Sequence, residues 1–257
     1  MNRKSQPAAL VIGSGNSLVL DSSRICSEGF LSLEKLITDL LFTLKRPELC
    51  TSIFTAVREL IQNATKASLK RIIFEEIQID PASKMDYTSG LQTFKKIIHS
   101  EDVMQYRSRI SQNRFRYSVQ FDYLNGALIV QVKSVFLLFL QEEFNIREKF
   151  RYIQSAKNLM EFYKEHSDLS EGSGMGIALI HILLQNSGVN PRNFVIYNDF
   201  QKQCTISRFI VPMEHGYVSP REEFLVLLDS CNLERDCLRN QIRSGERTLK
   251  SLSDAVA

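Results

Sequence analysis

The chain has 257 residues, a formal net charge of +3 at pH 7, and 44% hydrophobic and 24% charged residues. These values are typical of a globular protein, and a charge this close to neutral, without a face-forming run of Lys or Arg, argues against a nucleic-acid partner. Five scattered cysteines that are never spaced as CxxC argue against a disulfide scaffold and a zinc site.

The sequence also argues against a membrane partner. The basic start Met1–Lys4 could open a signal peptide, but the apolar stretch 8–12 is interrupted by Gly13–Asn16. The longest strongly apolar run, 135–140, is far too short to span a bilayer. We therefore expect a cytoplasmic protein.

The first half of the chain is predicted to be mainly helical after a short β element. Residues 9–20 read as a strand, a Gly/Asn turn and a second strand; the GSGN turn lacks the Gly spacing and the Lys-Ser/Thr of a phosphate loop. Apolar residues at helical spacing predict an amphipathic helix over 32–45, and a second helix over 48–74. Residues 79–102 read as a polar connector with a short helical patch at 94–98.

The second half alternates strands and helices. Residues 115–123 alternate in polarity, as in a half-exposed strand, and the Asn-Gly turn at 125–126 predicts a hairpin with a partner strand over 127–132. Further on, the pattern predicts a charged helix over 142–164, a buried helix over 177–184, two strands at 194–197 and 205–211, and helices from 220 onward that Gly245 interrupts. This order predicts an α/β (α+β) two-layer sandwich.

A carboxylate, an amide and an ammonium group share one face of the second helix. Glu59, Asn63 and Lys66 stand at i, i+4 and i+7, while Phe54, Val57, Ile61 and Ala64 line a different, apolar face. An amide oxygen can coordinate Mg²⁺, Lys can neutralise phosphate, and Glu can orient or deprotonate a nucleophile. A solvated polar face explains the stripe equally well.

A glycine-rich segment follows about 110 residues later. Glu171-Gly172-Ser173-Gly174-Met175-Gly176 leads directly into the predicted buried helix. Glycines here would let backbone N–H groups approach an anion at the helix N-terminus. Glycine turns before helices are common, so this segment alone is a weak signal.

Together, the two segments resemble the GHKL ATPases, the superfamily of gyrase, the large heat-shock chaperones, histidine kinases and mismatch-repair ATPases. ELIQNATKA is similar to the N-box of these proteins and EGSGMGIALI to their second glycine box. LKRIIFEE, the Phe94-Lys95 region and SGVNPRNF resemble segments of a bacterial group of stand-alone histidine-kinase-like ATPase domains. The resemblance implies an ATPase domain over 48–213 with a mixed sheet packed on helices, preceded by a hairpin and helix (1–47) and followed by a helical extension (214–257).

The resemblance also implies roles for particular residues toward ATP and Mg²⁺. Asn63 would be the Mg²⁺ ligand, Glu59 the activating carboxylate of catalysis, and Lys66 a phosphate contact. The glycine segment would form the lid hinge and phosphate cradle, and Thr205 would line the adenine pocket. The implied nucleotide-binding set is Asn63, Lys66, Gly172, Ser173, Gly174, Met175, Gly176 and Thr205.

The chain departs from the family after the predicted strand 127–132. The family carries Asp-x-Gly-x-Gly there, and its Asp accepts a hydrogen bond from the adenine amino group; this chain has Lys133-Ser134-Val135-Phe136-Leu137-Leu138. If Lys133 occupies the Asp position, a donor replaces an acceptor. The apolar run 135–140 either fills the rim of the pocket or belongs to the core.

Two functions follow as expectations. The first is a cytoplasmic ATP-binding signalling protein, either a slow ATPase or a kinase acting on another protein, because no histidine here has the neighbours of a phosphoacceptor. The second is a degenerate pseudo-ATPase that serves as a protein-interaction module. Leu and Ile residues among the charges of 220–257 indicate a helix that packs back on the domain or binds a protein partner, including a second copy.

Overall fold

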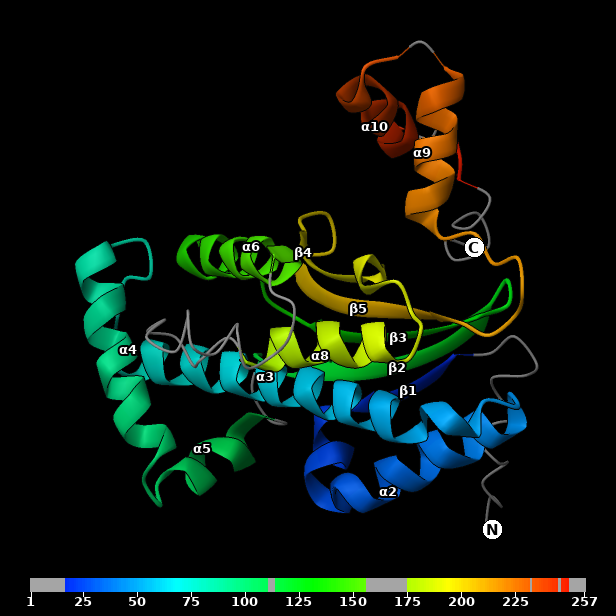
Figure 1. Cartoon of the computed structure of the whole chain (residues 1–257). Helices are drawn as coiled ribbons and strands as arrows, with labels where there is room; N and C mark the ends of the chain where they lie inside the picture. Colours follow the sequence, from blue (N-terminus) through cyan, green and yellow to red (C-terminus); the bar gives the residue numbers. More distant parts are fainter. Residues whose placement is uncertain (1–16, 111–113, 156–174, 232, 245, 250–257) are drawn as a thin grey trace, which may run out of the picture.

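The computed structural model describes residues 17–110, 114–155, 175–231, 233–244 and 246–249 (Figure 1). Its helices and strands follow in the order β1 (Leu18–Asp21), α2 (Ser22–Thr43), α3 (Cys50–Glu76), α4 (Lys84–Ile98), α5 (Val103–Ile110), β2 (Tyr117–Leu124), β3 (Ala127–Ser134), α6 (Leu140–Ser155), α8 (Met175–Asn186), β4 (Phe194–Asp199), β5 (Cys204–Pro212), α9 (Pro220–Ser230) and α10 (Arg235–Ser244). The first strand predicted within 9–20 lies outside the described residues, and the second is β1.

The five strands form one open sheet in the order β1-β2-β3-β5-β4. Every pairing within it is antiparallel. The predicted α+β class is confirmed, whereas the prediction of a mixed sheet is wrong. The reason lies in the connections: β2–β3 and β4–β5 are hairpins, and the long crossover from β3 brings β5 back beside β3 in the opposite direction.

The β2–β3 hairpin forms where the sequence predicts it. Asn125 and Gly126 have φ angles of 50° and 77°, the positive values that a two-residue hairpin turn of this kind requires. The turn sets a register in which Val119 lies opposite Val132, and Phe121 opposite Val130. All of these side chains therefore project from the same face of the sheet, where they are buried.

Helices cover that face of the sheet and form the second layer. In Figure 1, α3 and α8 run side by side in front of the strands, and α2 packs along α3. Ile53, Val57 and Leu60 of α3 join the sheet residues in one hydrophobic core. A polar contact crosses the same interface, because the hydroxyl oxygens of Thr65 and Tyr117 lie 2.9 Å apart.

The segment between α3 and β2 is more helical than predicted. Instead of a polar connector with a short patch, the chain forms the 15-residue helix α4 and then α5. The Ser83 side chain caps α4 by accepting a hydrogen bond from the Asp86 amide. Gly90 allows the helix to approach α3 closely, since a Cβ there would lie 3.0 Å from the Phe74 ring. Tertiary packing on α3 thus overrides the weak local pattern.

The C-terminal helices form a separate pair. A capping box joins Ser219 and Glu222 at the start of α9, and Figure 1 shows α9 and α10 standing away from the sheet and from α3. Leu238 of α10 is fully buried, but no residue of α9 is. No helix in the described part of the chain is long and apolar enough to cross a membrane.

Candidate functional site

The predicted polar stripe lies on a continuous helix. Because α3 runs unbroken from Cys50 to Glu76, Glu59, Asn63 and Lys66 share one face. Glu59 and Asn63 are half-buried, and Lys66 is exposed. Within the described part of the chain, neither the Glu59 nor the Asn63 side chain has a hydrogen-bond partner. Their polar atoms thus remain available to another group.

The N-terminus of α8 lies directly against this stripe. A Cβ on Gly176 would lie 2.9 Å from Glu59 Oε2 and 3.1 Å from Asn63 Nδ2, so any side chain at residue 176 would push the ends of these two side chains away. The structure therefore brings Glu59, Asn63 and Gly176 together from segments more than a hundred residues apart in sequence. Met175, the first residue of α8, is half-buried, and Gly172, Ser173 and Gly174 lie outside the described residues.

This contact combines groups that suit a metal-bound phosphate. The first backbone N–H groups of α8 have no partner within the helix, and its dipole favours negative charge. The Asn63 amide oxygen can coordinate Mg²⁺, which takes its remaining ligands from phosphate and water. Among the described residues, no three His, Cys, Asp or Glu side chains gather as a metal site.

Lys133 projects from the face of the sheet that is opposite to the helices, and so away from the contact of Gly176 with Glu59 and Asn63. Along β3, Val132 and Ser134 are buried toward the helices, whereas Lys133 projects from the opposite face, between Ser118 and Ile206 of the neighbouring strands. The position at the end of β3 that faces the helices is Ser134. Lys133 therefore points away from Glu59, Asn63 and Gly176.

The segment after β3 is held by hydrogen bonds between its backbone groups and side chains of other elements. Thr205 Oγ1 donates to the Phe136 carbonyl at 2.8 Å, and it also lies 3.1 Å from Asn198 Oδ1. The Leu138 amide donates to Asn198 Oδ1 at 2.9 Å, and the Phe139 amide to Glu142 Oε2 at 3.0 Å. Thr205 is only 6% exposed, and its hydroxyl belongs to this network.

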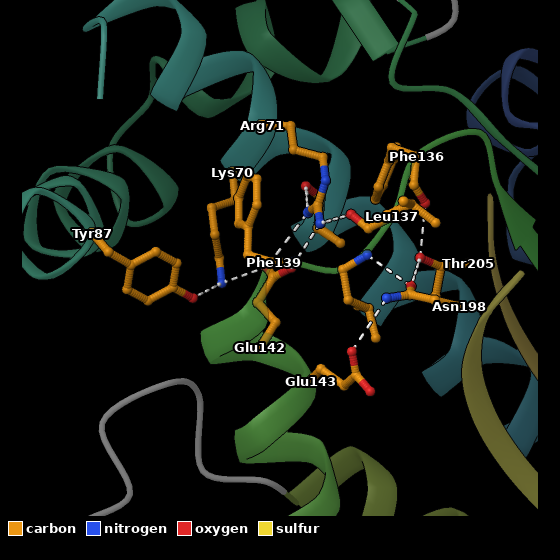
Figure 2. A network of polar contacts seen from close by, with 12 residues as sticks. Lys70, Arg71, Tyr87, Phe136, Leu137, Phe139, Glu142, Glu143, Asn198 and Thr205 are labelled. Atoms are coloured by element: carbon orange, nitrogen blue, oxygen red, sulfur yellow. Dashed lines mark hydrogen bonds and ion pairs between the residues drawn. The ribbon is translucent and has the colours of Figure 1, made fainter. Parts of the chain in front are cut away.

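A buried ion-pair cluster fixes the same segment to α3 (Figure 2). Arg71 donates to Glu142 Oε2 and to the Leu137 carbonyl, both at 2.7 Å. Its guanidinium carbon lies 3.9 Å from the ring centre of Phe136 and 4.3 Å from that of Phe139. A guanidinium group between two aromatic rings is held by cation–π attraction as well as by its hydrogen bonds.

Lys70 completes this cluster and extends it to α4. Its Nζ lies 3.0 Å from Glu142 Oε1 and donates to the Tyr87 hydroxyl at 3.3 Å. Burial alone would raise the pKa of the Glu142 carboxyl, but the positive charges of Lys70 and Arg71, with hydrogen bonds from Arg71 and the Phe139 amide, lower that pKa to about 2. Glu142 is therefore a carboxylate at neutral pH.

The sequence did not predict the cluster formed by Lys70, Arg71 and Glu142. Arg71 and Glu142 are 71 residues apart, and an ion pair at that separation has no local pattern. The available signal was the likeness of LKRIIFEE, which contains Lys70 and Arg71, to a family segment. For the apolar run 135–140, the sequence allows either the rim of a pocket or the core. Phe136 is buried and Leu140 is 82% exposed, so the run divides between the two environments.

Comparison with known proteins adds one relative. An "Uncharacterized protein" of Treponema pallidum (strain Nichols) is 28% identical over 156 residues, which cover 61% of this chain and 30% of the relative. The chain thus spans less than a third of that protein's length. No family model matches the chain, and no solved structure is similar enough to count as a match.

Proposed function

We propose that this chain is a cytoplasmic, Mg²⁺-dependent ATP-binding protein of the GHKL type with a regulatory role, acting as a slow ATPase or as a kinase on another protein. The observation that carries the proposal is the contact of Gly176 with Glu59 and Asn63. It supports a single phosphate site made from the two segments that resemble the N-box and the second glycine box. The domain would extend over 48–213, with the contacts of Lys66 and 172–176 as the resemblance implies them.

Each group at the contact has a role in this proposal. Asn63 would hold the metal, Lys66 would neutralise phosphate charge, and the N-terminus of α8 would bind phosphate oxygens. Glu59, one helical turn before Asn63, would reach the terminal phosphate and activate the attacking group. The protein thus binds the nucleotide mainly through its phosphates and metal.

Replacing Asn63 with alanine is expected to remove most of the thermal stabilisation that Mg·ATP produces. Ligand at a hundred times its Kd stabilises a protein by about 2.7 kcal/mol, and this stabilisation disappears with the affinity. The unliganded melting temperature should change little, because the Asn63 side chain is only half-buried and has no hydrogen-bond partner within the described residues. Scanning calorimetry with and without Mg·ATP measures both quantities.

The matched control is Gln62→Ala, which removes a half-buried side-chain amide from the position of α3 immediately before Asn63. Gln62 lies about 100° around the helix from Asn63, so its loss should leave the ATP-dependent shift in place. Equal stabilisation of wild type and Asn63→Ala would refute Asn63 as the metal ligand.

A second candidate function is a nucleotide-holding interaction module without turnover. It is favoured by the segment after β3, whose Phe136 and Leu137 carbonyls and Leu138 and Phe139 amides are all hydrogen-bonded within the protein. A protein partner, including a second copy, would then be the target. The exposed Val226 of α9 and the lack of any buried residue on that helix support such a contact.

Both functions predict poor selection of the base. Residues 133–139 include no Asp that could accept from the adenine amino group, and the Phe136 and Leu137 carbonyls are already hydrogen-bonded within the protein. Lys133 projects from the other face of the sheet. ATP and GTP should therefore compete within about tenfold, or about 1.4 kcal/mol, which is in the lower half of the roughly 1–3 kcal/mol that a well-made polar contact can discriminate. Competition against a fluorescent ATP analogue measures the ratio. A hundredfold preference for ATP would mean that another residue reads the base.

A further inference from the structure

A pocket of about 320 Å³ lies between α4 and α6, lined by other elements than the contact of Gly176 with Glu59 and Asn63. Its volume is at the lower end of the range for small-molecule sites. One wall is a single face of α4, where residues recur at helical spacing: Lys84, Tyr87, Thr88, Leu91, Gln92 and Lys95. The other wall is formed by Gln141 and Asn145 of α6.

The floor of the pocket is apolar and buried. Tyr87 is 4% exposed and Leu91 is 9% exposed. The Tyr87 hydroxyl faces inward, because it accepts a hydrogen bond from Lys70. The small parts of the Tyr87 ring and the Leu91 side chain that reach the pocket are therefore hydrocarbon, and a flat molecule can lie against them.

The rim of the pocket is positively charged. Lys84 and Lys95 are among the lining residues, and within the described part of the chain no Asp or Glu lines the pocket. The nearby carboxylate of Glu142 is directed away into the buried cluster, toward Lys70 and Arg71. Amide groups of Gln92 and Gln141 add hydrogen-bond donors to this rim. These groups favour an anion over a cation or a neutral ligand.

The spacing of the lysines bears on ligand shape. Lys84 and Lys95 are three helical turns apart, about 16 Å along the axis of α4, so a single small ion cannot contact both. The side chains of Lys84 and Lys95 can, however, reach opposite ends of a larger molecule that has an acidic group and a flat body lying over Tyr87 and Leu91.

We propose that the pocket between α4 and α6 binds a small organic anion with a planar body. The proposal stands independently of nucleotide binding at Asn63. A bound molecule would bridge α4 and α6, which the buried contacts of Lys70 with Tyr87 and Glu142 already connect.

Pyridoxal phosphate tests this proposal, because it is planar, anionic and able to mark the lysine that it approaches. Its aldehyde condenses with a lysine amine to an imine with loss of water, and borohydride then adds hydride to the imine carbon to leave a stable secondary amine. Mass spectrometry of the full chain locates each mark. Lys84 and Lys95 should be marked at least about fivefold faster than the exposed Lys96 and Lys202, since an attraction of about 1 kcal/mol suffices for that ratio.

Two charge variants on α4 provide a matched pair. Gln92→Glu puts a carboxylate in the pocket, whereas Ser89→Glu puts the same charge on an exposed position of α4 outside it. Gln92→Glu should slow the marking of both lysines about fivefold, and Ser89→Glu should not. Thr88→Glu, at another exposed position in the pocket, replaces Gln92→Glu if that variant melts earlier than wild type.

Two further comparisons test whether the shape of the ligand matters beyond its charge, and whether the pocket is independent of the proposed nucleotide site. Glyceraldehyde phosphate has the aldehyde and the phosphate but no ring, so it should show no preference for Lys84 and Lys95. Asn63→Ala should mark like wild type, whatever becomes of ATP binding. Marking of Lys84 and Lys95 at the rate of Lys96, equal effects of the two glutamate variants, or the same preference with glyceraldehyde phosphate would overturn the proposal.

Discussion

Glu142→Gln is expected to lower the free energy of unfolding by about 3–5 kcal/mol at neutral pH, the cost of breaking a buried ion pair by removing one partner. Glu142 is 6% exposed, and it contacts both Lys70 and Arg71. Glutamine keeps the shape of the side chain but not its charge. Urea unfolding of the two proteins measures the difference.

The same substitution should remove a pH dependence of stability. The pKa of Glu142 is lowered from 4.5 to about 2, so the folded protein binds fewer protons than the unfolded chain between these values. The stabilisation is therefore fully present above about pH 4.5 and is lost as the pH falls toward 2, by about 3 kcal/mol in all. The difference between wild type and Glu142→Gln should shrink over this range.

Glu148→Gln is the control on the same helix. Glu148 forms an ion pair with Arg151, whose side chain is 75% exposed, and such pairs contribute about 0–1 kcal/mol. If Glu142→Gln costs no more than this control, the buried cluster does not hold α6 in place. A wild-type unfolding free energy that stays flat from about pH 5 to 2.5 would refute the lowered pKa.

Glu59→Ala is expected to slow ATP turnover by roughly 10²–10⁴-fold if the protein is an enzyme, the usual contribution of a general base. Glu59 lies one turn before Asn63 and beside Gly176, so under the proposed function a metal held by Asn63 would bring the terminal phosphate within the reach of Glu59. The Kd for Mg·ATP should change little, because a base acts in the transition state. Phosphate release and labelling of candidate partner proteins at saturating Mg·ATP measure the effect.

Glu75→Gln supplies the control, since this exposed carboxylate lies four turns further along α3 and pairs with Arg114. It should leave turnover unchanged. If nucleotide is bound but the wild-type rates in both assays equal those of buffer, the proposed enzymatic function would be wrong and the interaction module would be the better function. Glu59→Ala would then alter nothing measurable.

Much of the fold could be predicted because its signals are local. The Asn125-Gly126 turn placed the β2–β3 hairpin, and apolar residues at helical spacing placed α3 and the buried side of α8. The sequence predicted only the last part of α4, because the buried residues Tyr87, Leu91 and Phe94 stand among polar ones. The burial of Tyr87 depends on tertiary contact with Phe74. The antiparallel sheet also could not be read from a sequence that shows strands but not their partners.

The sequence by itself determined which groups could act on a phosphate and that Glu59 and Asn63 share a helical face, because that follows from the period of the helix. Only the tertiary structure decided that Gly176 meets this pair and that Lys133 faces the other way, since contacts across a hundred residues depend on how helices pack on the sheet. The tertiary structure also decided the conformation of the segment after β3. There, Arg71 and Glu142 bind each other because burial makes an unpaired charge too costly, and their pairing holds Phe136–Phe139 in place.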